Sequence, residues 1–125
     1  MIDIRHRQRI KIVQELYASE FTNQTNLTNL TNKTHLILNS LNSLNSLIKQ
    51  HAPKFPIEKI AKIDLAILSL AIYELVVEKK HPPKVIINEA VELAKELGSE
   101  KSYSFVNAVL GKIYDKQTSS ALEKN

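Results

Sequence analysis

The 125-residue chain contains no cysteine, only two glycines and only four prolines. The absence of cysteine excludes disulfides, thiolate metal ligands and a cysteine nucleophile. A chain built of many strands needs more turn-forming residues than these, so helices are favoured. No segment approaches the roughly 18 apolar residues that a membrane span requires, and the charged first eleven residues do not resemble a secretory signal. We therefore expect a cytoplasmic protein without a membrane segment.

Hydrophobic residues make up 43% of the sequence, which argues against wholesale disorder. The length is sufficient for one domain with a core, so we expect residues 1–125 to form a single domain. Residues 22–47 are of low complexity, with Thr-Asn triplets up to about Lys33 and Leu-Asn-Ser triplets from Leu38 onward. The Thr-Asn part has poor helix propensity and predicts a flexible loop.

Apolar residues recur at spacings of three and four in five segments, which predicts helices with one buried face. The predicted helices span residues 4–20, 34–51, 57–78, 85–97 and 103–115. The apolar face expected for the first helix consists of Ile10, Val13, Leu16, Tyr17 and Phe21. The third is the best candidate for a central helix. The fold predicted from these segments is all-α, a compact bundle of about five to six helices.

Prolines and glycines set the boundaries of the later helices. Pro82 and Pro83 break the chain after the third helix. Gly98 is placed for a left-handed cap at the end of the fourth helix. Residues 117–125 are expected to form a flexible tail.

The sequence offers few groups suited to catalysis. The four histidines are scattered, and no two of them have the i, i+4 spacing that a helical metal site would prefer. There is no glycine-rich phosphate loop and no nucleophile elbow. Glu89 and Glu92 lie one turn apart and could pair as acid and base, although surface carboxylates are by far the commoner interpretation. We expect no enzyme activity, no metal and no cofactor.

The formal net charge is +4, and basic residues concentrate at the N-terminus. Residues 1–11 contain four basic side chains and His6 against the single carboxylate of Asp3; the four are Arg5, Arg7, Arg9 and Lys11. Such a cluster is typical of a phosphate-binding surface, but a solvated helix face has the same pattern. Tyr103 and Phe105 are candidates for stacking on unpaired bases, with packing in the core as the alternative.

Asp64 interrupts the apolar run of the predicted central helix. A buried carboxylate is costly without a partner. It therefore lies at the edge of the apolar face, forms an internal salt bridge, or is offered to another protein.

Several sequence blocks carry a family resemblance: RIKIVQELY at 9–17, DLAIL and AIYEL within 64–75, KVIINEA at 84–90, and FVN at 105–107. In combination they resemble the NusB family of transcription antitermination factors, over residues 5–20 and about 48–114. The resemblance implies an all-α fold of two small helical subdomains. It also implies binding of boxA-type ribosomal RNA leader sequences, together with the small-subunit ribosomal protein NusE, within an RNA polymerase antitermination complex.

The resemblance also implies positions for the binding residues. Asp64 falls where the family presents an acidic residue to NusE. The residues implied to meet single-stranded RNA are Arg5, His6, Arg7, Arg9, Lys84, Lys101 and Phe105. The chain departs from the family pattern at His6, where arginine is frequent, and at Ala108, where glycine is usual.

Two other functions are compatible with the sequence. One is a non-catalytic RNA-targeting module of the kind fused to RNA cytosine methyltransferases, which shares this helical fold. The other is a helical protein-interaction bundle that does not bind RNA.

Overall fold

The computed structural model describes residues 3–21 and 29–123, and the side chains of the last helix up to residue 118. Its elements in chain order are α1 (Ile4–Ser19), α2 (Asn32–Asn39), α3 (Leu41–His51), a 3₁₀ turn η2 (Ile57–Lys59), α4 (Lys62–Ile72), a π-helical segment η3 (Tyr73–Glu78), α5 (Pro83–Leu97) and α6 (Ser102–Glu123). No strand occurs within the described ranges, so the prediction of an all-α fold is confirmed. Most of the Thr-Asn repeat, and with it the predicted loop, lies outside the described residues.

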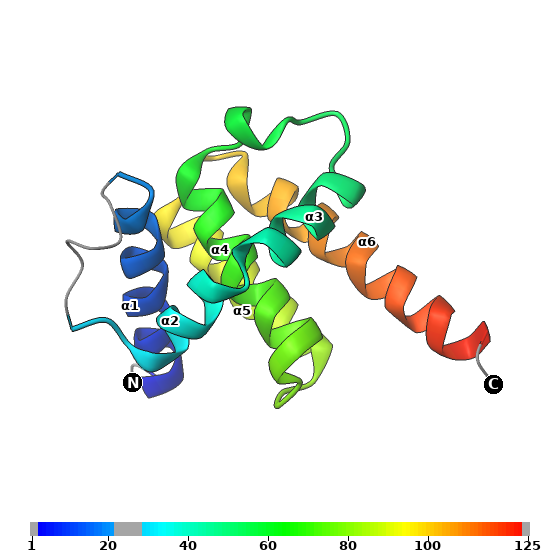
Figure 1. Ribbon diagram of the computed structural model, residues 1–125, viewed down its shortest axis with the longest axis horizontal. Coiled ribbons are helices and arrows are strands. Elements are labelled where there is room, and N and C mark those ends of the chain that lie inside the picture. The colour runs from blue at the N-terminus through cyan, green and yellow to red at the C-terminus, as the bar shows by residue number, and fades with distance from the viewer. Residues whose placement is uncertain (1–2, 22–28, 124–125) are drawn as a thin grey trace.

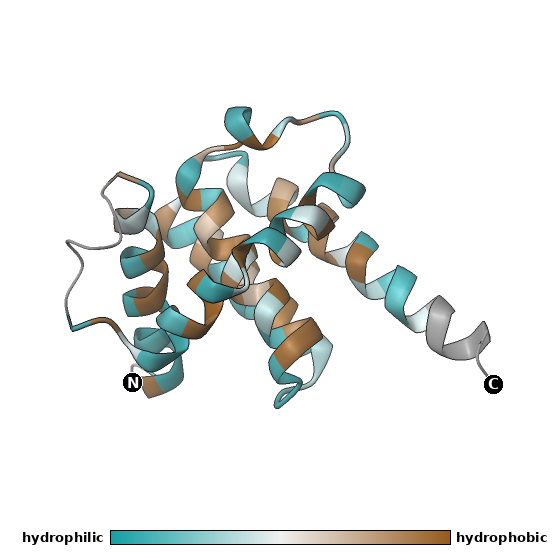
Figure 2. Ribbon diagram, in the orientation of Figure 1, coloured by the Kyte–Doolittle hydropathy of each residue, from teal (hydrophilic) through white to brown (hydrophobic). Residues whose placement is uncertain are grey.

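The central helix of the bundle is α4, which packs against α1, α3, α5 and α6 (Figure 1). All residues from Asp64 to Leu75 are buried, which is why this segment is apolar on nearly every side (Figure 2). After α4, the helices α5 and α6 pack against each other and against α4. The buried apolar side chains form one continuous cluster.

The buried face of α1 differs from the predicted one. It consists of Arg9, Ile12, Val13 and Leu16. The prediction that Tyr17 and Phe21 are buried is wrong, because they lie beyond the edge of this face and are 40% and 59% exposed. The face includes Arg9 instead, whose charge is neutralised by Glu74 of the π-helical segment η3.

The predicted helix 34–51 is two helices, α2 and α3, which meet at Ser40. A leucine every third residue drifts around a helix by about 60° per step, so one straight helix cannot bury the whole repeat. The break allows both Ile37 and Leu44 to be buried. Glu15 of α1 fixes the start of α2, because its carboxylate accepts hydrogen bonds from the Thr31 amide at 3.1 Å and the Thr34 hydroxyl at 2.6 Å.

The predicted helix 57–78 is also divided. The short turn η2 is followed by Ile60 and Ala61, whose backbone is extended, and α4 begins only at Lys62. The extended link points Ile60 into the core, where it is 6% exposed. At the other end the helix widens to a π-turn, which is closed by a hydrogen bond from the Lys79 amide to the Glu74 carbonyl at 2.9 Å.

Gly98 follows α5 but does not form the predicted left-handed cap, since its φ is −97°. Glycine is needed at this position because atoms of Ser102 and Ala94 lie too close to it for a Cβ. A Cβ at this position would lie 2.6 Å from the Ser102 Cβ and 2.8 Å from the Ala94 carbonyl oxygen. The glycine thus allows the chain to turn sharply between α5 and α6.

The last helix, α6, continues to Glu123, beyond the predicted end at residue 115. The predicted tail is therefore helical from 117 to 123. Neither glycine nor proline occurs after Gly111, so nothing in the local sequence stops the helix. Its C-terminal part extends past the body of the bundle (Figure 1).

Candidate nucleic-acid interface

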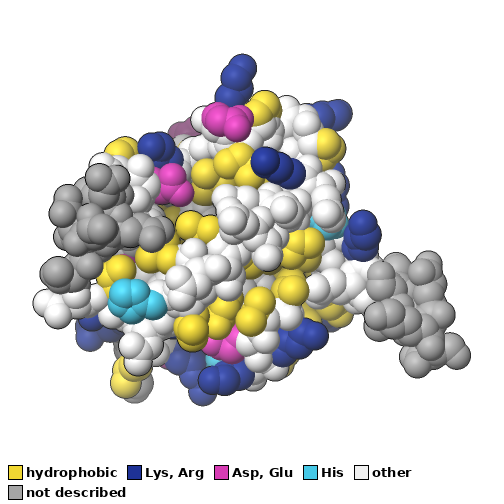
Figure 3. Space-filling model, in the orientation of Figure 1, with side chains coloured by type: hydrophobic (Ala, Val, Ile, Leu, Met, Phe, Trp, Pro, Cys, Tyr) yellow, Lys and Arg dark blue, Asp and Glu magenta, His cyan; other side chains and the backbone are white. Residues whose placement is uncertain are grey.

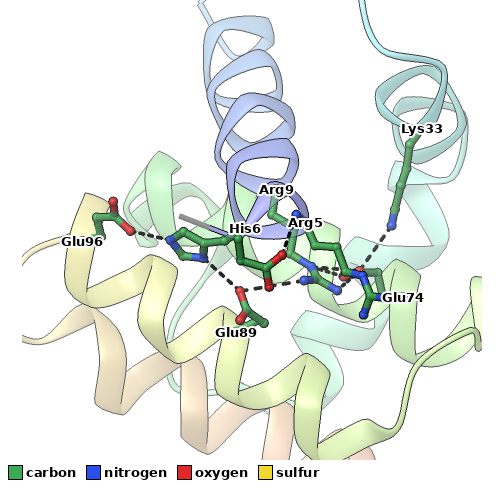
Figure 4. A network of polar contacts seen from close by, with 8 residues as sticks. Arg5, His6, Arg9, Lys33, Glu74, Glu89 and Glu96 are labelled. Carbon is green, nitrogen blue, oxygen red and sulfur yellow. Dashed lines mark hydrogen bonds and ion pairs between the residues drawn. The ribbon is translucent and has the colours of Figure 1, made fainter. Parts of the chain in front are cut away.

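The basic residues at the start of α1 divide into buried and exposed groups. Arg9 is 7% exposed. Its Nε donates to Glu74 Oε1 at 2.8 Å and its Nη2 donates to Glu74 Oε2 at 3.1 Å (Figure 4). Lys33 contacts the same carboxylate at 3.2 Å. The prediction that Arg9 holds phosphate is corrected: its guanidinium is engaged in an internal ion pair.

The pKa of Arg9 is consistent with this role. Burial disfavours the charged form, but the hydrogen bonds and charge of Glu74 outweigh burial and raise the pKa. The guanidinium therefore stays charged, and Glu74, which is 1% exposed, is not left unpaired.

His6 joins α1 to α5. Its Nδ1 lies 2.9 Å from Glu89 Oε2 and its Nε2 lies 2.7 Å from Glu96 Oε2 (Figure 4). The hydrogen bonds that His6 donates to Glu89 and Glu96 raise the pKa of His6, because both favour the imidazolium. With both ring nitrogens engaged, the predicted donation from His6 to RNA is also corrected. Glu89 is thus paired with His6, whereas Glu92 is 3.6 Å from Lys95, so they do not form an acid–base pair.

Arg5, Arg7 and Lys84 remain exposed. The structure shows no ion pair between these three side chains and any described residue. Arg5 and Arg7 lie at the start of α1, and Lys84 lies at the start of α5. The start of α6, which carries Phe105 and is directly preceded by Lys101, is at the opposite end of the bundle (Figure 1). The predicted RNA-binding residues therefore do not form one cluster.

Three predicted residues do come together at the start of α6. Lys101, Phe105 and Asp64 line one hollow of about 230 Å³, with Phe55 and Lys59 among the other lining residues. The rings of Phe55 and Phe105 meet edge to face, with their centroids 5.4 Å apart. We call this site the Phe105 hollow.

The Phe105 hollow has the groups that single-stranded RNA requires. Phe55 is 53% exposed, and unpaired bases stack on exposed aromatic rings. The exposed Lys59 and Lys101 supply positive charge for phosphate. Phe55 and Lys59 were not among the site residues predicted from the sequence. The only local signal for Phe55 was a large apolar residue between Pro53 and Pro56.

Asp64 forms the inner wall of this hollow and is 7% exposed. Burial raises the pKa of its carboxyl, and a hydrogen bond with Ser102 opposes that shift. Its Oδ1 has no hydrogen-bond partner among the described residues. Of the three arrangements considered for Asp64, the exposed helix edge does not occur, and no described residue forms a salt bridge with it.

A second aromatic group, also missed from the sequence, lies at the end of α1. The rings of Tyr17 and Phe21 meet edge to face at 5.0 Å, and the Lys62 ammonium lies 4.5 Å from the centre of the Phe21 ring. The available signal was two aromatic residues at i, i+4 that follow a basic segment.

The described residues contain no group of three or more side chains suited to a metal ion. None of the described helices is long and apolar enough to cross a membrane.

The sequence pattern of the NusB family matches residues 3–115. The chain belongs to the NusB family. The residues that carried the resemblance in the sequence were therefore correctly interpreted.

Relatives and solved structures agree with the assignment to the NusB family. The chain is 46% identical over 69 residues to the transcription antitermination protein NusB of Chloroflexus aggregans, which covers 54% of this chain and 46% of that protein. It is 40% identical over 76 residues to the protein of the same name from Finegoldia magna, covering 61% and 56%. The matched part of the chain thus spans about half the length of these curated relatives.

Among solved structures, Thermotoga maritima NusB superposes with a TM-score of 0.73 at 29% identity, covering 90% of this chain and 92% of that one. A crystal structure of the antitermination factors NusB and NusE with double-stranded RNA matches with a TM-score of 0.71 at 21% identity, covering 91% and 99%. At that identity the second match shows the fold alone.

Proposed function

We propose that the chain is a non-catalytic, cytoplasmic transcription antitermination factor that binds boxA-type RNA together with the ribosomal protein NusE. Membership of the NusB family supports this, since its relatives are antitermination proteins by name. The solved complex of a fold relative contains NusE and RNA. The observation that carries the proposal is the Phe105 hollow, where the exposed Phe55 ring, the partly buried Phe105 ring and two exposed lysines adjoin a buried carboxylate.

RNA binding has two parts in this proposal. An unpaired base stacks on Phe55 and Phe105 while Lys59 and Lys101 hold the neighbouring phosphates. Arg5, Arg7 and Lys84 add positive charge elsewhere on the surface and interact with RNA that extends past the hollow. Arg9 and His6 contribute indirectly by fixing α1 in place.

Asp64 is the proposed contact for the protein partner. A carboxylate that is nearly buried and lacks a partner for Oδ1 costs free energy in the isolated chain. A donor group from NusE that enters the Phe105 hollow and reaches Oδ1 removes that cost.

The test is binding of a boxA-type single-stranded RNA by Phe105→Leu, which keeps apolar volume and removes the ring. Base stacking on an aromatic side chain is worth about 1–3 kcal/mol, so affinity falls roughly 5- to 150-fold. The matched control is Tyr103→Leu, since Tyr103 is also exposed at the start of α6 but lies outside the hollow. Equal affinity of Phe105→Leu and the unmodified chain contradicts the proposal.

A further inference from the structure

The Phe105 hollow is the first of three hollows that adjoin one another along α6. The second, of about 170 Å³, shares Phe55 and Phe105 with the first. The third, of about 660 Å³, shares His51 with the second and lies between α3, the turn before α5 and the C-terminal half of α6. Together they form a continuous surface, which we call the α6 track.

Lysines line the whole α6 track. Each hollow has two, and all six are exposed: Lys59 and Lys101, Lys54 and Lys112, and Lys79 and Lys116. None of the six forms an ion pair with a described residue. The only carboxylate among the lining residues is the buried Asp64. Figure 3 shows basic side chains spread over the part of this face formed by α3 and α6.

Aromatic rings accompany the lysines at both ends of the track. Phe55 and Phe105 lie at the first end, and Tyr114 lines the third hollow beside the apolar side chains of Leu47 and Ile113. Lysines alone would suit any anionic partner, including an acidic peptide. Rings interspersed with lysines are typical of surfaces that bind single-stranded nucleic acid, because bases stack while phosphates pair with ammonium groups. The occupant that the track fits is therefore RNA.

We propose that single-stranded RNA bound at the Phe105 hollow continues along the α6 track to the third hollow. A base stacks on Tyr114, and Lys79 and Lys116 hold the phosphates at that end. This inference rests on the proposed RNA binding and adds a site to it. Phe105 and Lys116 are eleven residues apart on one helix, so the path is about 16 Å long. RNA must therefore extend beyond the segment that fills the first hollow.

The test compares a short boxA-type RNA with the same RNA extended by unstructured nucleotides at its 5′ or its 3′ end. The track variant is Lys79→Gln/Lys116→Gln. The control is Lys80→Gln/Lys95→Gln, which removes two exposed lysines that line none of the three hollows. Circular dichroism establishes that both variants are folded.

One of the two extensions is expected to tighten binding by the unmodified chain and by the control. The track variant binds the short RNA like the unmodified chain but loses the gain from extension. On the extended RNA, the slope of log K against log salt becomes shallower by about 1.4, the value for two lost single-strand phosphate contacts.

The inference is overturned if neither extension tightens binding, or if the gain persists in the track variant. It is also overturned if the track variant keeps the gain from extension but no longer binds a protein partner, since the α6 track is then a site for protein. Failure of the proposed function looks different: the short RNA does not bind, or Phe105→Leu binds it unchanged.

Discussion

At the scale of single residues, His6 connects α1 to α5 through hydrogen bonds that depend on its proton. Both ring nitrogens can donate to carboxylates only in the imidazolium form. The groups that face the ring are Glu89 and Glu96 of α5, and Arg9 lies 3.8 Å from Glu89. The two carboxylates raise the pKa of His6 above its ordinary value of 6.5.

This geometry predicts a pH-dependent stability. Because the folded chain binds the proton more tightly than the unfolded chain, the His6 contribution is fully present below the unfolded pKa. It is lost as the pH rises through the higher folded pKa. The measurement is the free energy of unfolding of the unmodified chain and of His6→Gln, from a pH below the unfolded pKa of His6 to a pH above its folded pKa. The difference between the two is expected to shrink with rising pH, and a difference that stays constant contradicts the assignment.

Arg9 and Glu74 form a buried pair, and breaking it should be costly. Arg9→Met leaves a nearly buried carboxylate with only Lys33 beside it, so we expect a loss of about 3–5 kcal/mol in the free energy of unfolding. The control is Arg7→Met on the exposed side of α1, expected to stay within about 0.5 kcal/mol. Similar losses in both variants would show that the pair has no special role.

The buried face of α1 was predicted only in part, at Val13 and Leu16. The spacing of Arg9 to Ile12, Val13 and Leu16 places all four on one helix face. The pairing partners could not be predicted, because Glu74 and Glu89 lie on helices far along the chain and local patterning does not show which charges meet. A basic cluster therefore looks the same in sequence whether its members face solvent or neutralise buried carboxylates.

At the scale of the elements, the two glycines have opposite roles. A Cβ at Gly98 would clash with Ser102 and the Ala94 carbonyl, whereas Gly111 has nothing within 4 Å of that position. Gly98→Ala should therefore destabilise the fold by about 1–3 kcal/mol, and Gly111→Ala should stabilise it by about 0.4–1 kcal/mol. Thermal unfolding of the two variants checks this, and a neutral Gly98→Ala contradicts the packing argument.

Helix positions were largely predictable, because apolar spacing reports which segments bury a face. The breaks at Ser40 and at Ile60–Ala61 were not, because tertiary packing decides where an apolar repeat divides. The end of α6 was missed for a related reason. A polar segment without glycine or proline continues a helix even though it buries little.

At the scale of the whole molecule, the exposed arginines are separated from the Phe105 hollow. If RNA reaches the start of α1, Arg5→Gln/Arg7→Gln reduces the salt dependence of binding, with the slope shallower by about 1.4 for two phosphate contacts. The affinity of this variant for RNA at low salt is also expected to be lower than that of the unmodified chain. The measurement is a salt titration of RNA binding, and an unchanged slope would restrict the RNA site to the α6 side of the molecule.

The candidate site was only partly predictable from the sequence, because tertiary packing brings some of its residues together. The resemblance to the NusB family indicated Asp64, Lys101 and Phe105, which the fold brings into one hollow. Phe55 and Lys59 come from the connection between α3 and α4, where no helical pattern marks a function. Only the packing of that connection against α6 shows that they belong to the site.

The central claim is that the Phe105 hollow binds single-stranded RNA. Its most direct test is nuclear magnetic resonance of the isotope-labelled chain titrated with a boxA-type RNA. We predict the largest chemical-shift changes at Phe55, Lys101 and Phe105, and small ones at the internal pair Arg9 and Glu74. Changes absent from the hollow, or confined to the start of α1, would contradict the account.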